Sequence, residues 1–104
     1  MSGAANPHRG EASILVNGSQ YLLRPSFTAL VAAEEELGSL FALVERAGEG
    51  RLKLSEMSAL FWHCLEQQNS ISRDQIGEAV LESGLAKCAA PLRAILIQIL
   101  QGAG

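Results

Sequence analysis

The sequence lacks an excess of basic residues. Lys and Arg number 8 against 11 for Asp and Glu, which gives a formal net charge of −3 at pH 7. Because proteins bind nucleic acid largely through cations that displace counterions from the phosphates, we expect no nucleic acid partner. The acids are concentrated in residues 26–50, where five glutamates accompany a single arginine. This imbalance predicts an acidic face.

Long apolar segments are also missing. The opening twelve residues, MSGAANPHRGEA, hold no apolar stretch that could serve as the core of a signal peptide. The longest mostly aliphatic stretch, residues 94–100, is too short to span a bilayer. We therefore expect a cytoplasmic protein with no membrane partner.

Cysteine is scarce, and its spacing is not that of a redox or metal motif. The two cysteines, Cys64 and Cys88, stand in apolar surroundings and form no C-x-x-C pair. This pattern fits reduced thiols in the core of a cytoplasmic protein, whereas a disulfide between them is the weaker alternative.

Motifs that carry catalysis are absent as well. The sequence has neither a Walker loop nor a G-x-G-x-x-G motif. His63 and Cys64 are neighbours on a predicted helix, where successive side chains diverge by about 100°, so they do not form a catalytic dyad. The run Glu34 to Glu36 fans around a helix in the same way, which favours a solvated acidic face over a metal site. We expect no enzymatic activity, no cofactor and no bound metal.

The length and composition predict one small domain. A chain of 104 residues with 48% hydrophobic content can bury a core of its own. Residues 1–10 carry no periodicity and are predicted to form a flexible N-terminal arm, while residues 11–104 form a single domain. The predicted fold class is α+β, with an N-terminal β-hairpin (11–24) packed on a small bundle of four to five short helices (26–101).

The hairpin is predicted from the dipeptide Asn17-Gly18, which lies between two segments of alternating apolar residues. Asn-Gly supplies the two residues with positive φ that a type I′ turn requires. A two-residue turn sets the register, which pairs Val16 with Ser19, Ile14 with Tyr21, Ala12 with Leu23, and Glu11 with Arg24. The resulting apolar face must be covered by the helices that follow.

Five helical segments follow from apolar spacing, caps and glycine stops. They cover residues 27–37, 40–47, 56–68, about 73–83 and 85–101, the last as one kinked helix or two short ones because it contains Pro91. In the first, an apolar stripe contains Phe27, Leu30, Val31 and Leu37. Glu34 falls in the same stripe, where its carboxylate needs a partner such as Arg24, Arg9 or free backbone amides.

Three apolar or amphipathic residues have no obvious place in the predicted core. Trp62 and His63 lie on opposite flanks of the apolar stripe of the third helix. Ile97 lies on the polar side of the last helix, opposite a broad apolar face with Leu96 at its centre. We predict that Trp62, His63 and Ile97 bind a partner protein, the alternative being that each is an ordinary residue at the rim of the core.

The order of several segments resembles that of a known family. These segments are ANPHRGE at residues 5–11, a strand and a turn with Gly18, YLLR at 21–24, a helix ending in EEELG at 34–38, and residues 39–46. They resemble the small tail proteins of alphaproteobacterial gene transfer agents, which are encoded beside the tail genes of phage-like particles. The similarity runs from about residue 5 to 65 and continues to the end as a helix pattern only.

The resemblance implies a non-enzymatic role in tail assembly. Members of this family are labelled tail tube proteins, and are also interpreted as tail assembly chaperones that bind the tape measure protein and help the tube protein polymerise. The expected partners are therefore the tape measure protein and the tail tube protein, with a homo-oligomer also possible. The alternatives are a structural subunit of the tail and a small cytoplasmic protein-binding adaptor. Trp62-His63 and Pro91 depart from the general family pattern.

Overall fold

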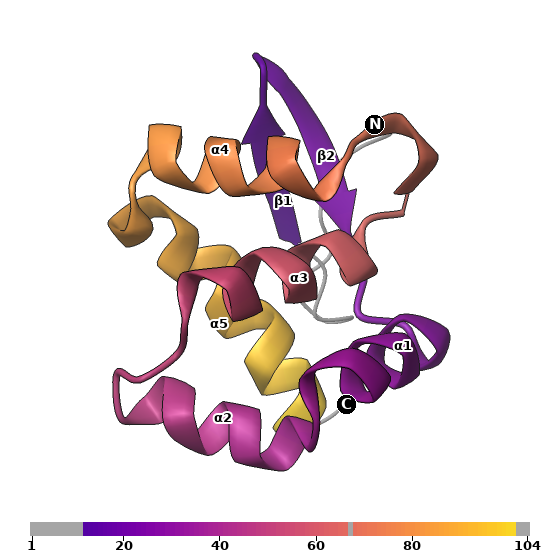
Figure 1. The fold of residues 1–104 in the computed structure, drawn as a ribbon, viewed down its shortest axis with the longest axis vertical. Coiled ribbons are helices and arrows are strands. Elements are labelled where there is room, and N and C mark those ends of the chain that lie inside the picture. The colour runs from indigo at the N-terminus through magenta and orange to yellow at the C-terminus, as the bar shows by residue number, and fades with distance from the viewer. Residues whose placement is uncertain (1–11, 67, 102–104) are drawn as a thin grey trace.

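The computed structural model describes residues 12–66 and 68–101 (Figure 1). The elements are β1 (Ala12–Val16), β2 (Ser19–Leu23), α1 (Phe27–Leu37), α2 (Leu40–Gly48), α3 (Leu54–Cys64), a short 3-10 helix (Gln68–Ser70), α4 (Arg73–Ser83) and α5 (Leu85–Gln101). In this described part of the chain, a two-stranded antiparallel hairpin followed by five α-helices confirms the predicted α+β class. The predicted arm, residues 1–10, lies outside the described residues.

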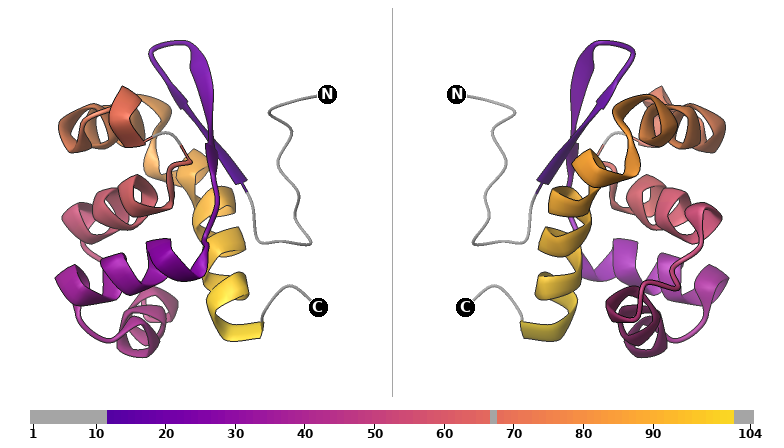
Figure 2. Two further views of the ribbon diagram at one scale, coloured as in Figure 1. Left: turned by 90° about the vertical axis from the view of Figure 1, so that its right-hand side faces the viewer. Right: turned by 90° about the vertical axis from the view of Figure 1, so that its left-hand side faces the viewer.

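The elements form two layers around one core. Helices α1 to α4 stack in one layer, and the hairpin and α5 form the other (Figure 2). Strand β1 packs against α4 and α5, while α3 packs against both α1 and α4. The largest fully buried side chains are Phe61, Leu23, Leu43, Leu60, Ile76, Ile95, Val80 and Cys64. Because these residues come from both layers, neither layer buries its apolar side without the other.

The hairpin has the predicted register. Ala12 pairs with Leu23, Ile14 with Tyr21 and Val16 with Ser19. Asn17 and Gly18 have φ values of 52° and 83°, as a type I′ turn requires. The predicted pairing of Glu11 with Arg24 lies outside the described residues.

Helix α3 ends earlier than predicted, at Cys64 instead of Gln68. Leu65 leaves the helix and forms a β-bridge with Leu23. The amide of Arg24 donates to the carbonyl of Cys64 at 2.6 Å. These bonds to the end of β2 take the place of a further helical turn. The apolar spacing within residues 56–68 cannot reveal them, because their partners lie in another part of the chain.

The apolar stripe predicted for α1 is wrong in part. Phe27 is 84% exposed and Val31 is also exposed, whereas the buried residue of this helix is Ala33. Helix α1 packs on α3 through the Ala33 side, so the Phe27 side faces solvent. Two further stripe residues, Leu30 and Leu37, are partly buried against the core.

Glu34 is exposed, but it has one of the predicted partners. Its Oε2 accepts a hydrogen bond from the backbone amide of Leu40 at 3.2 Å. That amide lies at the N-terminus of α2, where backbone donors lack helical partners and a carboxylate is favourable. Glu34 therefore fixes the turn between α1 and α2.

Pro91 lies inside a single helix. Helix α5 runs without a break from Leu85 to Gln101, so the alternative of two short helices is wrong. The cysteines are both buried and free, as predicted. Burial raises the pKa of the Cys64 thiol to about 12, which keeps it protonated and unreactive at neutral pH.

Candidate functional site

Trp62 and His63 lie in a polar cluster that joins α1, α3 and α4. His63 Nε2 lies 2.8 Å from Oε1 of Glu36, and Arg73 donates from Nη1 to Oε2 of the same carboxylate at 2.6 Å. The Arg73 guanidinium lies 4.6 Å from the centroid of the Trp62 ring, a cation–π distance. Trp62 Nε1 donates to the carbonyl of Ile71 at 3.1 Å. Each member thus has a partner on another element.

The contacts of this cluster join three helices. The hydrogen bonds from Arg73 and His63 lower the pKa of Glu36 to about 2, so its carboxylate is ionised at neutral pH. In the ranges 12–66 and 68–101, no hydroxyl or thiol donates a hydrogen bond to His63. The Glu36–His63 pair is a partly buried link between α1 and α3.

His63, predicted to lie on the flank of the apolar stripe of α3, is buried. The residue is only 8% exposed, because α1 packs on α3 and brings the Glu36 carboxylate to Nε2 of the His63 ring. Trp62 is half-buried, and both residues line a hollow of about 480 Å³ beside the start of α1. Glu36 and Arg73 are the members that the sequence reasoning missed. No local signal could have found them, since they lie far from His63 in the chain.

Ile97 lies on a different surface, a groove of about 410 Å³ between α2 and α5. The α5 side is built by Ala89, Leu92, Arg93, Leu96, Ile97 and Leu100, which recur at helical spacing, and the α2 side by Val44, Ala47 and Gly48. Ile97 is 44% exposed, and Leu100 beside it is also exposed. An exposed, elongated apolar groove between two helices is a shape that accepts a helix from another protein.

The three predicted partner-binding residues therefore do not share one surface. Trp62 and His63 line the hollow near α1, and Ile97 lines the α2–α5 groove. Of the three, Ile97 has the most exposed side chain and the most apolar surroundings. The partner-binding role of all three stays a prediction, and the α2–α5 groove is the candidate with exposed large apolar side chains, Ile97 and Leu100.

The described residues form neither a candidate metal site nor a candidate membrane-spanning helix. Among these residues, no group of three or more His, Cys, Asp or Glu side chains is placed to hold a metal ion. None of the described helices has the length and apolar character needed to cross a membrane.

A partly buried ion pair fixes the start of α3 against α2. Arg46 donates two hydrogen bonds to the two carboxylate oxygens of Glu56, both at 2.7 Å. Glu56 Oε1 also accepts from the backbone amide of Lys53 at 2.9 Å, which caps α3. The Arg46 bonds, aided by the Lys53 amide, lower the pKa of Glu56 to about 2.

The lowered pKa values of Glu36 and Glu56 predict that the folded protein loses stability in acid. Glu36 and Glu56 both have a pKa of about 2 in the folded protein against 4.5 for an ordinary glutamate. A lowered folded-state pKa stabilises the fold above the unfolded value, and this contribution disappears as the pH falls from about 4.5 to about 2. Urea unfolding across this window should show the decline. In the double variant Glu36→Gln and Glu56→Gln we expect a shallower pH dependence, whereas an unchanged slope would mean that other carboxylates cause it.

Comparison with known proteins identifies one family. A family model described as "Phage tail tube protein, GTA-gp10" matches residues 9–102, nearly the whole chain. No curated protein and no solved structure shows a significant match.

Proposed function

Because the chain belongs to the phage tail tube protein, GTA-gp10 family, we propose that it is a tail assembly chaperone that binds the tape measure and tail tube proteins. The family is one of phage tail proteins and not of enzymes. Chaperoning of this kind would take place in the cytoplasm, during assembly of the tail of a gene transfer agent. The protein would act by covering partner surfaces, for which it needs grooves and not a catalytic pocket.

The observation that supports this proposal is the exposed apolar groove between α2 and α5. It occurs in a chain that belongs to a family of phage tail proteins. A chaperone must expose an apolar surface that its partner covers, and must fold stably without that partner. The exposed Ile97 and Leu100 supply such a surface, while Ile95 on the same helix is fully buried and anchors α5 in the core. Helix α5 can therefore present one side without losing its place in the fold.

A structural subunit of the tail is the second candidate, because the family description itself names a tail tube protein. A tube that closes into rings commonly depends on extensive β-sheet between subunits, an argument by analogy alone. In the described part of the chain the sheet has two strands. This small sheet favours the chaperone over the subunit.

Co-purification separates these candidates. The chain is expressed with the tape measure and tail tube proteins of its own genome, each partner is pulled down, and finished particles are probed for the chain. Binding together with absence from particles is the expected result. Presence in particles would make the protein a structural subunit. Absence of binding to either partner would overturn the proposal in favour of a small adaptor protein.

The substitution Ile97→Asp tests the groove within this experiment. We expect binding of the tail partner to weaken by about tenfold, which corresponds to roughly 1.4 kcal/mol, because the carboxylate must lose water when the groove is covered. The free energy of unfolding should change by less than about 0.5 kcal/mol, since Ile97 is largely outside the core. Affinity is measured by titration calorimetry, and stability by urea unfolding.

Leu85→Asp is the matched control for this variant. Leu85 is exposed on the same helix but does not line the groove. If Leu85→Asp weakened partner binding as much as Ile97→Asp, the effect would come from added charge and not from the groove.

A further inference from the structure

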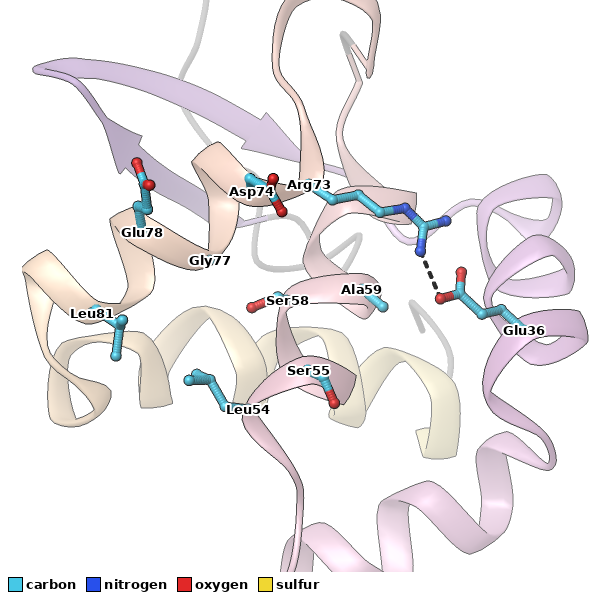
Figure 3. Close-up of a pocket in the computed structure, with 10 residues that line it drawn as sticks. All are labelled: Glu36, Leu54, Ser55, Ser58, Ala59, Arg73, Asp74, Gly77, Glu78 and Leu81. Atoms are coloured by element: carbon cyan, nitrogen blue, oxygen red, sulfur yellow. Dashed lines mark hydrogen bonds and ion pairs between the residues drawn. The ribbon is translucent and has the colours of Figure 1, made fainter.

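A second groove, separate from the α2–α5 groove, lies between α3 and α4 and has a volume of about 530 Å³. Figure 3 shows Leu54 and Leu81 together at one end and the Glu36–Arg73 pair at the other. Leu54 is 41% exposed and Leu81 is 64% exposed, so two large apolar side chains lie open to solvent on the same groove. The proposed function does not use this surface.

The middle of the groove is lined by small residues. Ser58 of α3 faces Gly77 of α4 across it, and Ala59 of α3 also lines the groove (Figure 3). A Cβ atom placed on Gly77 would lie 3.6 Å from Oγ of Ser58, an ordinary contact distance, so the two helices approach each other closely here. Short side chains in the middle and leucines at one end leave a trough that can receive side chains of a docked helix.

The rim of this groove carries negative charge that none of the described residues neutralises. Asp74 and Glu78 line it from α4, one helical turn apart, and both are exposed. Neither carboxylate has a side-chain hydrogen bond or ion pair within residues 12–66 and 68–101. Among the described residues that line the groove, Arg73 is the one basic residue, and Glu36 already binds it. The unpaired charge is therefore acidic.

We propose that the α3–α4 groove docks an amphipathic helix of a partner protein that carries Lys or Arg residues one turn apart. Such a helix would cover Leu54 and Leu81 with its apolar face. Its basic residues, at the same spacing as Asp74 and Glu78, would lie opposite these two carboxylates.

A second copy of this chain is a poorer occupant of the groove. The chain has a net charge of −3, so two copies repel each other at an acidic rim. The helical basic residues are Arg46 on α2, Arg73 on α4, and Lys87 and Arg93 on α5, and no two of them are one turn apart. No described helix of the chain therefore carries the required pair of basic residues.

A synthetic helical peptide tests the proposal without any tail protein. The peptide carries Leu and Ala on one face and Lys residues four apart on its flank, and a second peptide has Glu in place of each Lys. We expect the Lys peptide to bind and the Glu peptide not to bind. In an amide NMR spectrum of the isotope-labelled protein, the shifts on binding should be largest at α3 and α4. Shifts centred on another surface would overturn the proposal.

The decisive test removes the two negative charges at the rim of the groove and compares the effect with the removal of two charges elsewhere. Asp74→Asn with Glu78→Gln should weaken binding of the Lys peptide by about fivefold at low salt, as expected for two exposed ion pairs. The matched control, Glu35→Gln with Glu45→Gln, removes the same charge from exposed glutamates of α1 and α2 that do not line the groove. It should leave the affinity nearly unchanged. Equal weakening by both pairs would show general attraction to an acidic protein and overturn the proposal.

The apolar end of the groove is tested separately. Leu81→Asn should weaken binding of the Lys peptide by about fivefold, since it removes an apolar contact worth roughly that factor. Leu15→Asn is its control, because Leu15 is half-exposed on β1 and does not line this groove. Self-association of the wild-type chain that Leu81→Asn abolishes would mean that a second copy occupies the groove. Failure of these tests would leave the proposed function at the α2–α5 groove intact.

Discussion

Replacement of Phe61 by alanine is expected to lower the free energy of unfolding by about 3–5 kcal/mol. Phe61 lies on α3 and is fully buried, and it is the largest of the fully buried side chains. Phe61 belongs to the main apolar core, to which both layers contribute, so the cavity left by the ring would open inside that core. The surrounding helices could collapse into this space only in part, and the cavity adds to the loss of apolar burial.

The effect would be large in relation to the whole stability of the domain. Single domains unfold with about 5–15 kcal/mol, so Phe61→Ala should bring the protein close to marginal stability. Urea unfolding followed by circular dichroism measures the change. Phe41→Ala is the matched control, because Phe41 is exposed on α2 and its loss should cost less than about 0.5 kcal/mol. Similar losses of unfolding free energy in both variants would mean that Phe61 is not a core residue.

The elements that could be predicted from the sequence are those fixed by local signals. Asn17-Gly18 determines the turn geometry, and the turn length then determines the pairing from Ala12 to Leu23. The start of α4 follows in the same way from a capping box, in which Ser72 accepts from the amide of Gln75 and Gln75 accepts from the amide of Ser72. In both cases the residues that decide the structure are close neighbours in the chain.

The prediction failed where contacts between distant residues decide the outcome. The end of α3 at Cys64 depends on bonds to Leu23, the last residue of β2, and to Arg24, which follows it. The solvent-facing side of α1 depends on how this helix lies on α3, and spacing alone placed Phe27 on the buried side. Periodicity identifies an apolar stripe, but it does not say which part of the stripe a neighbouring helix covers.

The candidate site shows the same limit. Glu36, His63 and Arg73 come from three helices, and their cluster exists only because α1 and α4 both pack on α3. Ile97, in contrast, could be singled out from the sequence, because an isoleucine on the polar side of a helix is unexplained by the core. The groove that surrounds it required knowledge of where α2 lies.

Ile95→Asp is expected to abolish cooperative folding, although Ile95 lies only two residues from Ile97, where we expect aspartate to be tolerated. Ile95 is fully buried and belongs to the main apolar core. An aspartate there would be an unpaired carboxylate in an apolar site, which costs several kcal/mol or forces the site to open. That cost is comparable to the whole stability of a domain of this size. Leu96, at the centre of the apolar face predicted from spacing, is only partly buried and lines the groove.

The comparison of Ile95→Asp with Ile97→Asp therefore separates anchoring from binding on one helix. Thermal unfolding followed by circular dichroism should show a cooperative transition for Ile97→Asp and none for Ile95→Asp. Side chains two positions apart point to different sides of a helix. The two substitutions therefore affect stability differently only if α5 is packed on the core in one fixed orientation. A cooperative transition close to that of the wild type in both variants would mean that α5 is not part of the core. In that case the α2–α5 groove would not persist in solution, and the partner-binding role of Ile97 would lose its structural basis.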